Sequence, residues 1–546
     1  MKSRAEAQRS IENQRFDLCV IGGGATGAGC ALDAQLRGLH TVLIEAADFA
    51  SGASGASTKI VHGGVRYLQQ AAEKLDVRQY RVVKRALHER ARMLANAPYL
   101  TRQLEFVIPC FSWRELVYYR AGMKIYDWMA GAAALTPSHT VARSETLRRL
   151  PALKPDGLTG AVIYSDGQFD DCRYGIALVQ TFAENGGEVL NHARVVGFKK
   201  DGAGLIVAVR VRDEVGHREF SVRAKAFVNA TGAAADRARE MAHTGIARRM
   251  RPSKGVHVVL PLEGFSNDAA LLIPSTEDGR VIFAIPWRGV LLVGTTDDAA
   301  LDNDELMVTQ AEADYLLRHV NRYLRRSFAQ DEILSCSAGL RPLVSVAGGR
   351  KTGELIRDHE VECDQESGLI SILGGKWTTY RAMAEETIDA VQVRLGVSGD
   401  CKTRNLLLSG SAGPDDWEGL TQKSGISVET ALHLKQKFGS KAAGVLQIAN
   451  NNLEMAEQLV EGFPAIRAEV VYCIREEMAM TIEDVLARRI GLQLLSWQAS
   501  IKAALVVGKI LGREFNWSQK MEEDAVSDYV EPIQRQRERL SSPCQP

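Results

Sequence analysis

This sequence has few features of a metal-binding, nucleic-acid-binding or membrane-spanning protein. Its nine cysteines are scattered with no C-x-x-C pair, which argues against a zinc or iron–sulfur site and for a reducing compartment. Lys plus Arg and Asp plus Glu both number 67, so the net charge of zero does not suggest nucleic-acid binding. No run of eighteen apolar residues occurs, and the first fifteen residues lack the apolar core of a secretory signal. We therefore expect a cytoplasmic protein without a spanning helix, in which attachment to the inner face of the membrane stays open.

A glycine-rich turn near the N-terminus carries the strongest functional signal. An apolar run at 18–21 predicts a buried parallel strand, followed by a helix over 25–37 and a second strand over 41–44. Between the first strand and the helix, three glycines have the G-x-G-x-x-G spacing of a dinucleotide pyrophosphate cradle: Gly22, Gly24 and Gly27. Glu45 closes the second strand, where an acidic side chain suits the ribose hydroxyls of an adenosine. The motif predicts a dinucleotide site but does not separate NAD from FAD.

The rest of the chain divides into regions of different pattern. Small residues and hydroxyls dominate 46–68, which suits close approach of a ligand. Short β-branched runs over 187–231 predict a β-meander that ends in a buried strand, and 256–296 is again rich in strands. Beyond Gly399 the pattern becomes helical, and the last thirty or so residues are polar enough that we expect poor order.

One helical segment, 113–135, combines aromatic side chains with arginine and lysine. Such a segment suits a membrane interface, where rings lie at headgroup level and cations face lipid phosphate. A helix that simply packs on the core has the same composition, so both interpretations stay open.

Several stretches together resemble the FAD-dependent glycerol-3-phosphate dehydrogenases of the D-amino-acid-oxidase-like flavoprotein superfamily. The matching stretches follow the order of the family and extend from residue 21 to about 385: IGGGATGAGCALDAQLRG, SGASGASTKIVHGGVRYL, YSDGQFDDCRY, VNATG, LVGTTD, GLRPL and GGKWTTYRAMAE. Residues 475–489, REEMAMTIEDVLARR, are similar to the helical cap of the family.

The resemblance implies an α/β fold: a Rossmann-like FAD-binding domain, an inserted α+β substrate domain and an all-helical C-terminal domain. The domain limits that we expect are 16–76, 150–232 and 340–395 for the FAD domain, 77–149 and 233–339 for the substrate domain, and 400–515 for the helical domain. Residues 1–15 and 516–546 are expected to be tails.

The resemblance also implies a reaction, in which sn-glycerol 3-phosphate is oxidised at C2 to dihydroxyacetone phosphate and hydride passes to a noncovalent FAD. Electrons then go to a quinone. The family positions for substrate binding are Arg66, Tyr67, Arg341, Arg357 and Lys376, and arginine suits a phosphate dianion because of its planar fork of donors. Lys376 would polarise the new carbonyl or steady the reduced flavin. Flavin contacts are expected from Gly22, Gly24, Gly27, Glu45, Ser54, Ser57, Thr231, Gly232, Gly375 and Lys376.

The reaction needs a base for the C2 hydroxyl, and histidine is the side chain that titrates near neutrality. His257, in the apolar run 255–260, matches a substrate-site histidine of the family, so we predict that it is catalytic together with Arg341 and Lys376. His62 fits the flavin side better, and His359 is a second candidate for the base.

Three alternatives stay open at this stage. An oxidase of the same substrate would pass electrons to oxygen, and an amine or amino-acid oxidase would bind a carboxylate. A flavin-binding sensor without turnover would bind FAD but would not be reduced. A homodimer is also left open.

Overall fold

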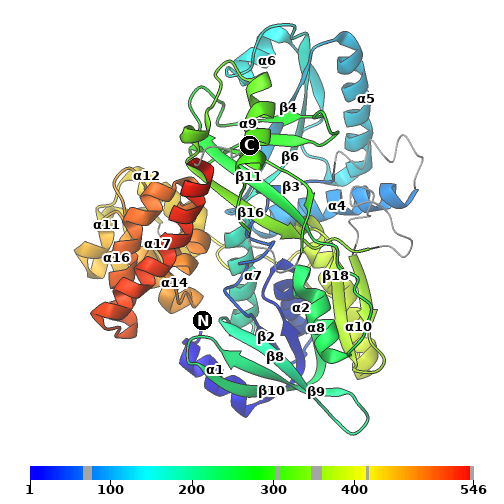
Figure 1. Cartoon of the computed structure of the whole chain (residues 1–546), viewed down its shortest axis with the longest axis vertical. Helices are drawn as coiled ribbons and strands as arrows, with labels where there is room; N and C mark the ends of the chain where they lie inside the picture. Colours follow the sequence, from blue (N-terminus) through cyan, green and yellow to red (C-terminus); the bar gives the residue numbers. More distant parts are fainter. Residues whose placement is uncertain (65–76, 302–305, 346–358, 414–416, 542–546) are drawn as a thin grey trace.

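The structure is a computed structural model that describes residues 1–64, 77–301, 306–345, 359–413 and 417–541. Two β-sheets and a group of C-terminal helices make up the molecule (Figure 1). In Figure 1 the sheet that carries the N-terminal glycine turn lies at the bottom, the second sheet lies above it, and the C-terminal helices lie to one side of both.

The first sheet has a parallel core, as the buried apolar strands predict. In spatial order its strands are β17 (His359–Cys363), β18 (Leu369–Gly374), β10 (Arg218–Asn229), β1 (Arg15–Ile21), β2 (Thr41–Ile44) and β7 (Glu188–Leu190), with β8 (Ala193–Lys200) and β9 (Ile206–Asp213) extending from β10. β1 pairs in parallel with both β10 and β2. The predicted meander is confirmed, because β8, β9 and β10 pair as antiparallel neighbours.

Small side chains allow the helices that cover this sheet to pack closely against one another. α2 (Ala25–Leu36) packs between α7 (Asp171–Glu184) and α10 (Tyr380–Leu395). A Cβ on Gly29 of α2 would lie 2.9 Å from the Tyr380 ring, so glycine is what allows α2 and α10 this spacing.

The second sheet is mostly antiparallel. In spatial order its strands are β15 (Asp298–Ala299), β11 (Ser253–Pro261), β14 (Val290–Gly294), β13 (Ile282–Trp287), β12 (Ala269–Ile273), β4 (Thr101–Cys110), β6 (Gly160–Phe169) and β3 (Ile60–Val61), with β16 (Ser335–Arg341) beside β11 and β5 (His139–Ala142) beside β6. α4 (Val77–Asn96) and α5 (Trp113–Ala130) share one apolar core with this sheet, and α9 (Gln310–Tyr323) packs on β11, β13 and β14. The short helices α6 (Arg143–Arg149) and α8 (Ala235–Ala242) contact β6 and β18 respectively.

The region after residue 400 is helical, which confirms the expected helical C-terminal domain. Its elements are α11 (Trp417–Ser424), α12 (Val428–Phe438), α13 (Ala442–Asn451), α14 (Arg467–Glu477), the π-helix η8 (Asp484–Arg489), α15 (Leu492–Leu495), α16 (Trp497–Phe515) and α17 (Gln519–Ser541). Across the described ranges, no helix has both the length and the apolar character that a bilayer crossing requires.

The expected poor order of the C-terminal tail is wrong, and the N-terminal fifteen residues are also structured. α17 buries Tyr529, Ile533 and Leu540 against the helical domain, because apolar side chains recur on one face of an otherwise polar helix. At the other end of the chain, α1 (Arg4–Asn13) buries Ile11 and pairs Arg4 with Asp213. Both segments are therefore part of the folded body.

The expected limit at residue 150 is also wrong for one strand. β6 was placed in the FAD domain, but it pairs with β4 along its whole length and so belongs to the second sheet. The other domain limits stay predictions.

Candidate functional site

The N-terminal glycine turn forms a tight backbone cradle between β1 and α2. Gly22 has a φ of 107°, and a Cβ there would lie 2.6 Å from the carbonyl oxygen of Ala230 at the end of β10. A Cβ on Gly27 would lie 1.8 Å from the carbonyl oxygen of Gly22, so this helix position admits only glycine. The N-terminus of α2 points its backbone N–H groups and the positive end of its dipole at this turn, which suits a pyrophosphate.

Glu45 braces the same turn from the end of β2. One carboxylate oxygen accepts the N–H of Gly23 at 2.5 Å and the other accepts the N–H of Ala47 at 2.8 Å. Burial raises the pKa of this carboxyl. Glu45 therefore holds the turn itself, and the expected contact with a ribose stays a prediction.

A cavity of about 720 Å³ runs from this turn to the second sheet. Six of the predicted flavin residues line it: Gly22, Gly24, Glu45, Ser54, Thr231 and Gly232. Ala338, Gly339 and Leu340 of β16 in the second sheet also line it, with Pro342 after that strand and Gly374 at the end of β18 in the first sheet. The space lies between the sheets, where an elongated cofactor bound by its pyrophosphate at the glycine turn would extend toward β16.

The two predicted serines have different positions. Ser54 Oγ lies in the wall of the cavity and accepts the N–H of Ala25, at the start of α2, at 2.9 Å. Ser57 instead donates its hydroxyl to Asp171 at 2.7 Å and, among the described residues, is absent from this wall. Asp171 also forms a buried ion pair with Lys59. The structure thus gives the Ser57 hydroxyl a bracing contact, and its contact with the flavin stays a prediction.

His257 and Arg341 lie on the same face of the second sheet. β11 and β16 pair so that Gly255 is opposite Gly339 and His257 is opposite Ser337. The Arg341 guanidinium lies over Gly255, where a Cβ would come within 2.3 Å of it. Glycine at 255 therefore leaves the space through which Arg341 reaches toward His257.

Arg341 is held by two side chains that follow β14. It donates to Thr295 Oγ1 at 2.7 Å and contacts Asp297 Oδ1 at 3.3 Å. Its side chain stays 23% exposed, so a ligand can still reach the guanidinium.

The His257 ring is buried, and a hydrogen bond at one of its two nitrogens orients it. Its Nε2 lies 2.9 Å from Thr58 Oγ1, and within the described part of the chain its Nδ1 has no hydrogen-bond partner. Burial, and then the charges of Arg341 and Lys59, lower its pKa to about 3. The pKa of the ring thus lies well below the near-neutral value expected of the base, so the ring is neutral at pH 7.

The remaining predicted residues divide into two groups. Arg66, Tyr67 and Arg357 lie outside the described residues. Lys376 is described, and it follows β18 and caps the short 3-10 helix η5 (Trp377–Thr379) that leads into α10, with Gly375 at a φ of 94° before it.

The two secondary histidine candidates lie in different sheets. His359 is on β17 of the first sheet, where its Nε2 pairs with Glu386 at 2.6 Å. His62 follows β3 of the second sheet and packs near the Phe283 ring. His359, already engaged in an ion pair, is the weaker base candidate.

Four residues of the site were not predicted: Thr58, Thr295, Asp297 and Trp377. The Nε1–H of Trp377 donates to the Ser54 carbonyl at 2.7 Å and so joins the turn at 374–376 to the cavity wall. The stretches LVGTTD and GGKWTT contain three of these residues, but a motif does not show which of its hydroxyls turn toward a guanidinium.

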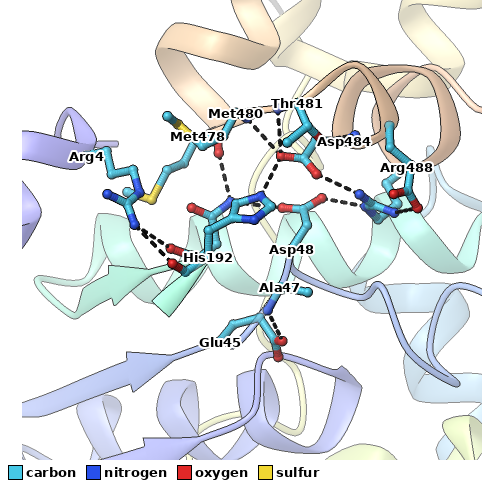
Figure 2. Close-up of polar contacts among 12 residues, drawn as sticks. Arg4, Glu45, Ala47, Asp48, His192, Met478, Met480, Thr481, Asp484 and Arg488 are labelled. Atoms are coloured by element: carbon cyan, nitrogen blue, oxygen red, sulfur yellow. Dashed lines mark hydrogen bonds and ion pairs between the residues drawn. The ribbon is translucent and has the colours of Figure 1, made fainter. Parts of the chain in front are cut away.

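A second polar cluster joins the first sheet to the helical domain (Figure 2). Ligand-type atoms of Asp48, His192 and Asp484 lie within 4.8 Å of one another, which is a spacing that a metal ion could use. Arg488 donates to Asp48 at 2.6 Å and to Asp484 at 2.6 Å, and Arg489 pairs with Asp48 as well. Because two arginines already neutralise the two carboxylates, we interpret this cluster as an ion-pair network that docks the helical domain.

Comparison with known proteins agrees with this geometry. Residues 17–381 match the family described as FAD dependent oxidoreductase, and residues 401–522 match the C-terminal domain of alpha-glycerophosphate oxidase. The chain is 41% identical to the mitochondrial glycerol-3-phosphate dehydrogenase of Mesocricetus auratus, over 95% of this chain and 73% of that protein. It is 40% identical to the human protein of the same name, over 94% of this chain and 73% of that protein.

Among solved structures, the chain is similar to the glycerol-3-phosphate dehydrogenase of Bacillus halodurans complexed with FAD. The two share 30% sequence identity and a TM-score of 0.80, with 99% of each chain covered.

Proposed function

Because the chain belongs to the family of FAD-dependent glycerol-3-phosphate dehydrogenases, we propose that it oxidises the C2 hydroxyl of sn-glycerol 3-phosphate to the ketone of dihydroxyacetone phosphate. The observation that carries the proposal is the juxtaposition of His257 and Arg341 beside the cavity between the sheets. Thr58, which contacts His257, follows Ala56 of the cavity wall by two residues. The base candidate thus adjoins the segment that lines the cofactor space.

The residues around the cavity fit FAD. A Cβ on Gly22, Gly24 or Gly27 would meet neighbouring protein atoms, so glycine at these positions permits the tight turn that suits a pyrophosphate. Thr231 and Gly232 line the same cavity and offer a second turn beside it. When bound, FAD supplies the acceptor for the hydride that leaves C2. The chain itself supplies binding, orientation and the movement of one proton.

Arg341 is proposed to bind the substrate phosphate. A guanidinium can make two parallel hydrogen bonds to phosphate oxygens, and the Arg341 side chain is 23% exposed, which makes it accessible to a ligand. Arg66, Tyr67, Arg357 and Lys376 are proposed to complete the substrate site, as the resemblance implies.

His257 is proposed to take the proton of the C2 hydroxyl. A neutral imidazole is needed for this, and the lowered pKa of His257 keeps the ring neutral at physiological pH. The same low pKa makes the ring a weak base. A phosphate dianion at Arg341 would offset the positive charge that disfavours protonation, so substrate binding would raise the pKa of His257 toward a useful value.

The direct test is anaerobic. Adding sn-glycerol 3-phosphate to the FAD-loaded protein without oxygen should bleach the flavin absorbance, and dihydroxyacetone phosphate should form in equal amount. If the absorbance does not change while an amine or amino acid bleaches it, the proposed substrate is wrong. Binding without any reduction would favour a flavin sensor.

The electron acceptor is proposed to be a quinone. After anaerobic reduction, the flavin absorbance should return quickly on adding a short-chain quinone and slowly on adding oxygen-saturated buffer. Rapid peroxide formation with oxygen alone would instead identify an oxidase.

Two variants separate binding from chemistry. Arg341→Ala should raise KM strongly with FAD still bound, because the arginine contacts substrate in both the ground and transition states. His257→Ala should chiefly lower kcat, by about 100-fold or more, the usual size of a lost general base. If His257→Ala keeps full turnover across pH, another group is the base.

α5 is proposed to rest on a membrane surface. One of its faces is buried through Met123 and Tyr126, whereas its other face leaves Trp113 66% and Trp128 71% exposed. Large exposed aromatics beside arginine and lysine suit the headgroup region of a lipid bilayer. Leu453 is 80% exposed on the C-terminal helical region, which makes it a control position.

Flotation with anionic phospholipid vesicles tests the contact. The double variant Trp113→Ser, Trp128→Ser should lose vesicle binding, while Leu453→Ser should bind as the unchanged protein does. Equal binding of all three would exclude α5 as the contact. The same samples, analysed by sedimentation without vesicles, show whether the protein forms the homodimer that the sequence leaves open.

A further inference from the structure

A second, small cavity lies where the helical domain meets both sheets. It has a volume of about 120 Å³, and its wall comes from the segment 55–59, the β13–β14 turn, the end of α12 and the region of η8. Charged side chains crowd this wall, four of them cationic and one anionic: Lys59, Arg288, Lys437, Arg488 and Asp170. Among described residues, Arg341, Lys376 and His257 do not line it, although Ala56 lines both this cavity and the cofactor cavity.

Two of the four cations are neutralised by partners outside the cavity. Lys59 forms a buried ion pair with Asp171. Arg488 donates to Asp48 and Asp484, both of which are buried, as Figure 2 shows. The side chains of Lys59 and Arg488 therefore line the cavity but add little uncompensated charge to it.

The other two cations share a single carboxylate. Arg288 reaches Asp170 Oδ2 at 3.0 Å, and Lys437 Nζ lies 3.5 Å from that same oxygen. Two positive charges therefore face one negative charge, which leaves an excess of one positive charge at the cavity.

Lys437 is the side chain that lacks a good partner. The residue is only 1% exposed, and its three ammonium N–H groups donate no hydrogen bond to any residue that the structure describes, apart from the long contact to Asp170. Burial and then the charge of Arg288 lower its pKa to about 8, the direction expected for an ammonium with too little negative charge around it. A buried ammonium with unused donors is costly unless an acceptor is bound.

We propose that this cavity binds a small inorganic oxyanion, of the phosphate or sulfate type, between Lys437 and Arg288. An oxyanion would accept hydrogen bonds from the ammonium and the guanidinium at once, and would balance the excess charge. The volume suits an ion of this size.

Such an ion would join three parts of the fold. Arg288 comes from the second sheet, Asp170 precedes α7 beside the first sheet, and Lys437 comes from α12 of the helical domain. Because the native protein alone brings these groups together, bound anion should stabilise the native state by mass action.

Thermal unfolding of the FAD-loaded protein tests the proposal, with sodium phosphate replacing sodium chloride at constant ionic strength. The Tm should rise with phosphate and reach a plateau. Lys437→Met keeps most of the side-chain volume and removes the charge. It should weaken the phosphate dependence by about 10- to 100-fold, the effect of losing one hydrogen bond from a charged donor.

Lys441→Met is the matched control. Lys441 lies four residues away and pairs with Glu184 outside the cavity, so this variant should keep the phosphate dependence. Phosphate that binds at Arg341 would affect both variants alike, so the difference between them reports on the cavity. Equal phosphate dependence in Lys437→Met and the unchanged protein would overturn the proposal.

A crystallographic measurement on the unchanged protein covers the case in which Lys437→Met does not fold. Crystals soaked in selenate should show an anomalous peak within hydrogen-bond distance of Lys437 Nζ. Water alone at that position, with selenate bound elsewhere in the same crystal, would also overturn the proposal.

Discussion

Substituting Gly27 by alanine, which adds one methyl group, should weaken FAD binding while the rest of the fold is kept. Gly27 lies in the first turn of α2, directly behind the cradle, and its missing side chain is what lets the helix approach β1. In Gly27→Ala, the new Cβ would lie 1.8 Å from the carbonyl oxygen of Gly22. Neither atom belongs to a flexible side chain, so α2 and the glycine turn must move apart.

The size of the effect follows from this contact. Overpacking of a buried position ordinarily costs about 1–3 kcal/mol, and a backbone oxygen that cannot rotate away places this position at the upper end. If the whole free-energy cost of overpacking falls on the glycine turn that binds FAD, about 3 kcal/mol corresponds to a loss of roughly 100-fold in FAD affinity. The first sheet can keep its strand pairing, because the displaced atoms lie beyond the end of β1.

The assay is FAD retention after dialysis, measured by absorbance against protein concentration, together with the Tm of the apoprotein. Gly122→Ala in α5 is the control, since a Cβ there meets nothing within 4 Å and alanine favours a helix by up to about 1 kcal/mol. We expect Gly27→Ala to lose FAD while Gly122→Ala keeps it with an equal or higher Tm. Full FAD retention in Gly27→Ala would refute the argument that close packing of α2 creates the cradle.

Two further predictions concern buried charge. The pKa of His257 is about 3 in the native state and about 6.5 when unfolded, so the unfolded state binds more protons between these values and stability falls as pH falls through this window. Urea titration measures the unfolding free energy of the unchanged protein and of His257→Gln as a function of pH. Below pH 6.5 the unfolding free energy of the unchanged protein should drop relative to that of the variant by up to about 1.4 kcal/mol per pH unit. If the two proteins show the same dependence of unfolding free energy on pH, the burial of a neutral ring is contradicted. In the same assay, Glu477→Gln should lower the unfolding free energy by about 3–5 kcal/mol, because it leaves the Arg173 guanidinium without its buried counter-charge. Arg173 donates to the two carboxylate oxygens of Glu477 at 2.6 and 2.7 Å. A loss below about 1 kcal/mol would show that water reaches the pair.

Local pattern was sufficient where neighbours in the sequence are also neighbours in space. The run at 18–21, the three glycines and the strand at 41–44 are confirmed with bounds that differ by a few residues at most, because a buried strand, a tight turn and a helix start each depend on a few adjacent side chains. The helices at 77–96 and 428–438 were likewise predictable from their apolar spacing.

The sequence led to a wrong prediction where the average polarity of a segment hid the regular spacing of its few apolar residues. The C-terminal segment is polar overall, yet Tyr529, Ile533 and Leu540 recur at helical intervals and anchor α17. Its partner surface is the helical domain, which local composition does not reveal.

The sequence by itself determined a dinucleotide site, through a motif whose glycines are required by the backbone geometry of a single turn. The resemblance to a family then pointed to FAD, and also to His257 and Arg341. Only the tertiary structure decided that these two side chains lie on the same face of paired strands, that Ser57 turns to Asp171 instead of the cofactor cavity, and that Lys437 faces Arg288 and Asp170. The physical reason is that side-chain direction and charge balance depend on strand register and domain docking, which are set by contacts between distant parts of the chain.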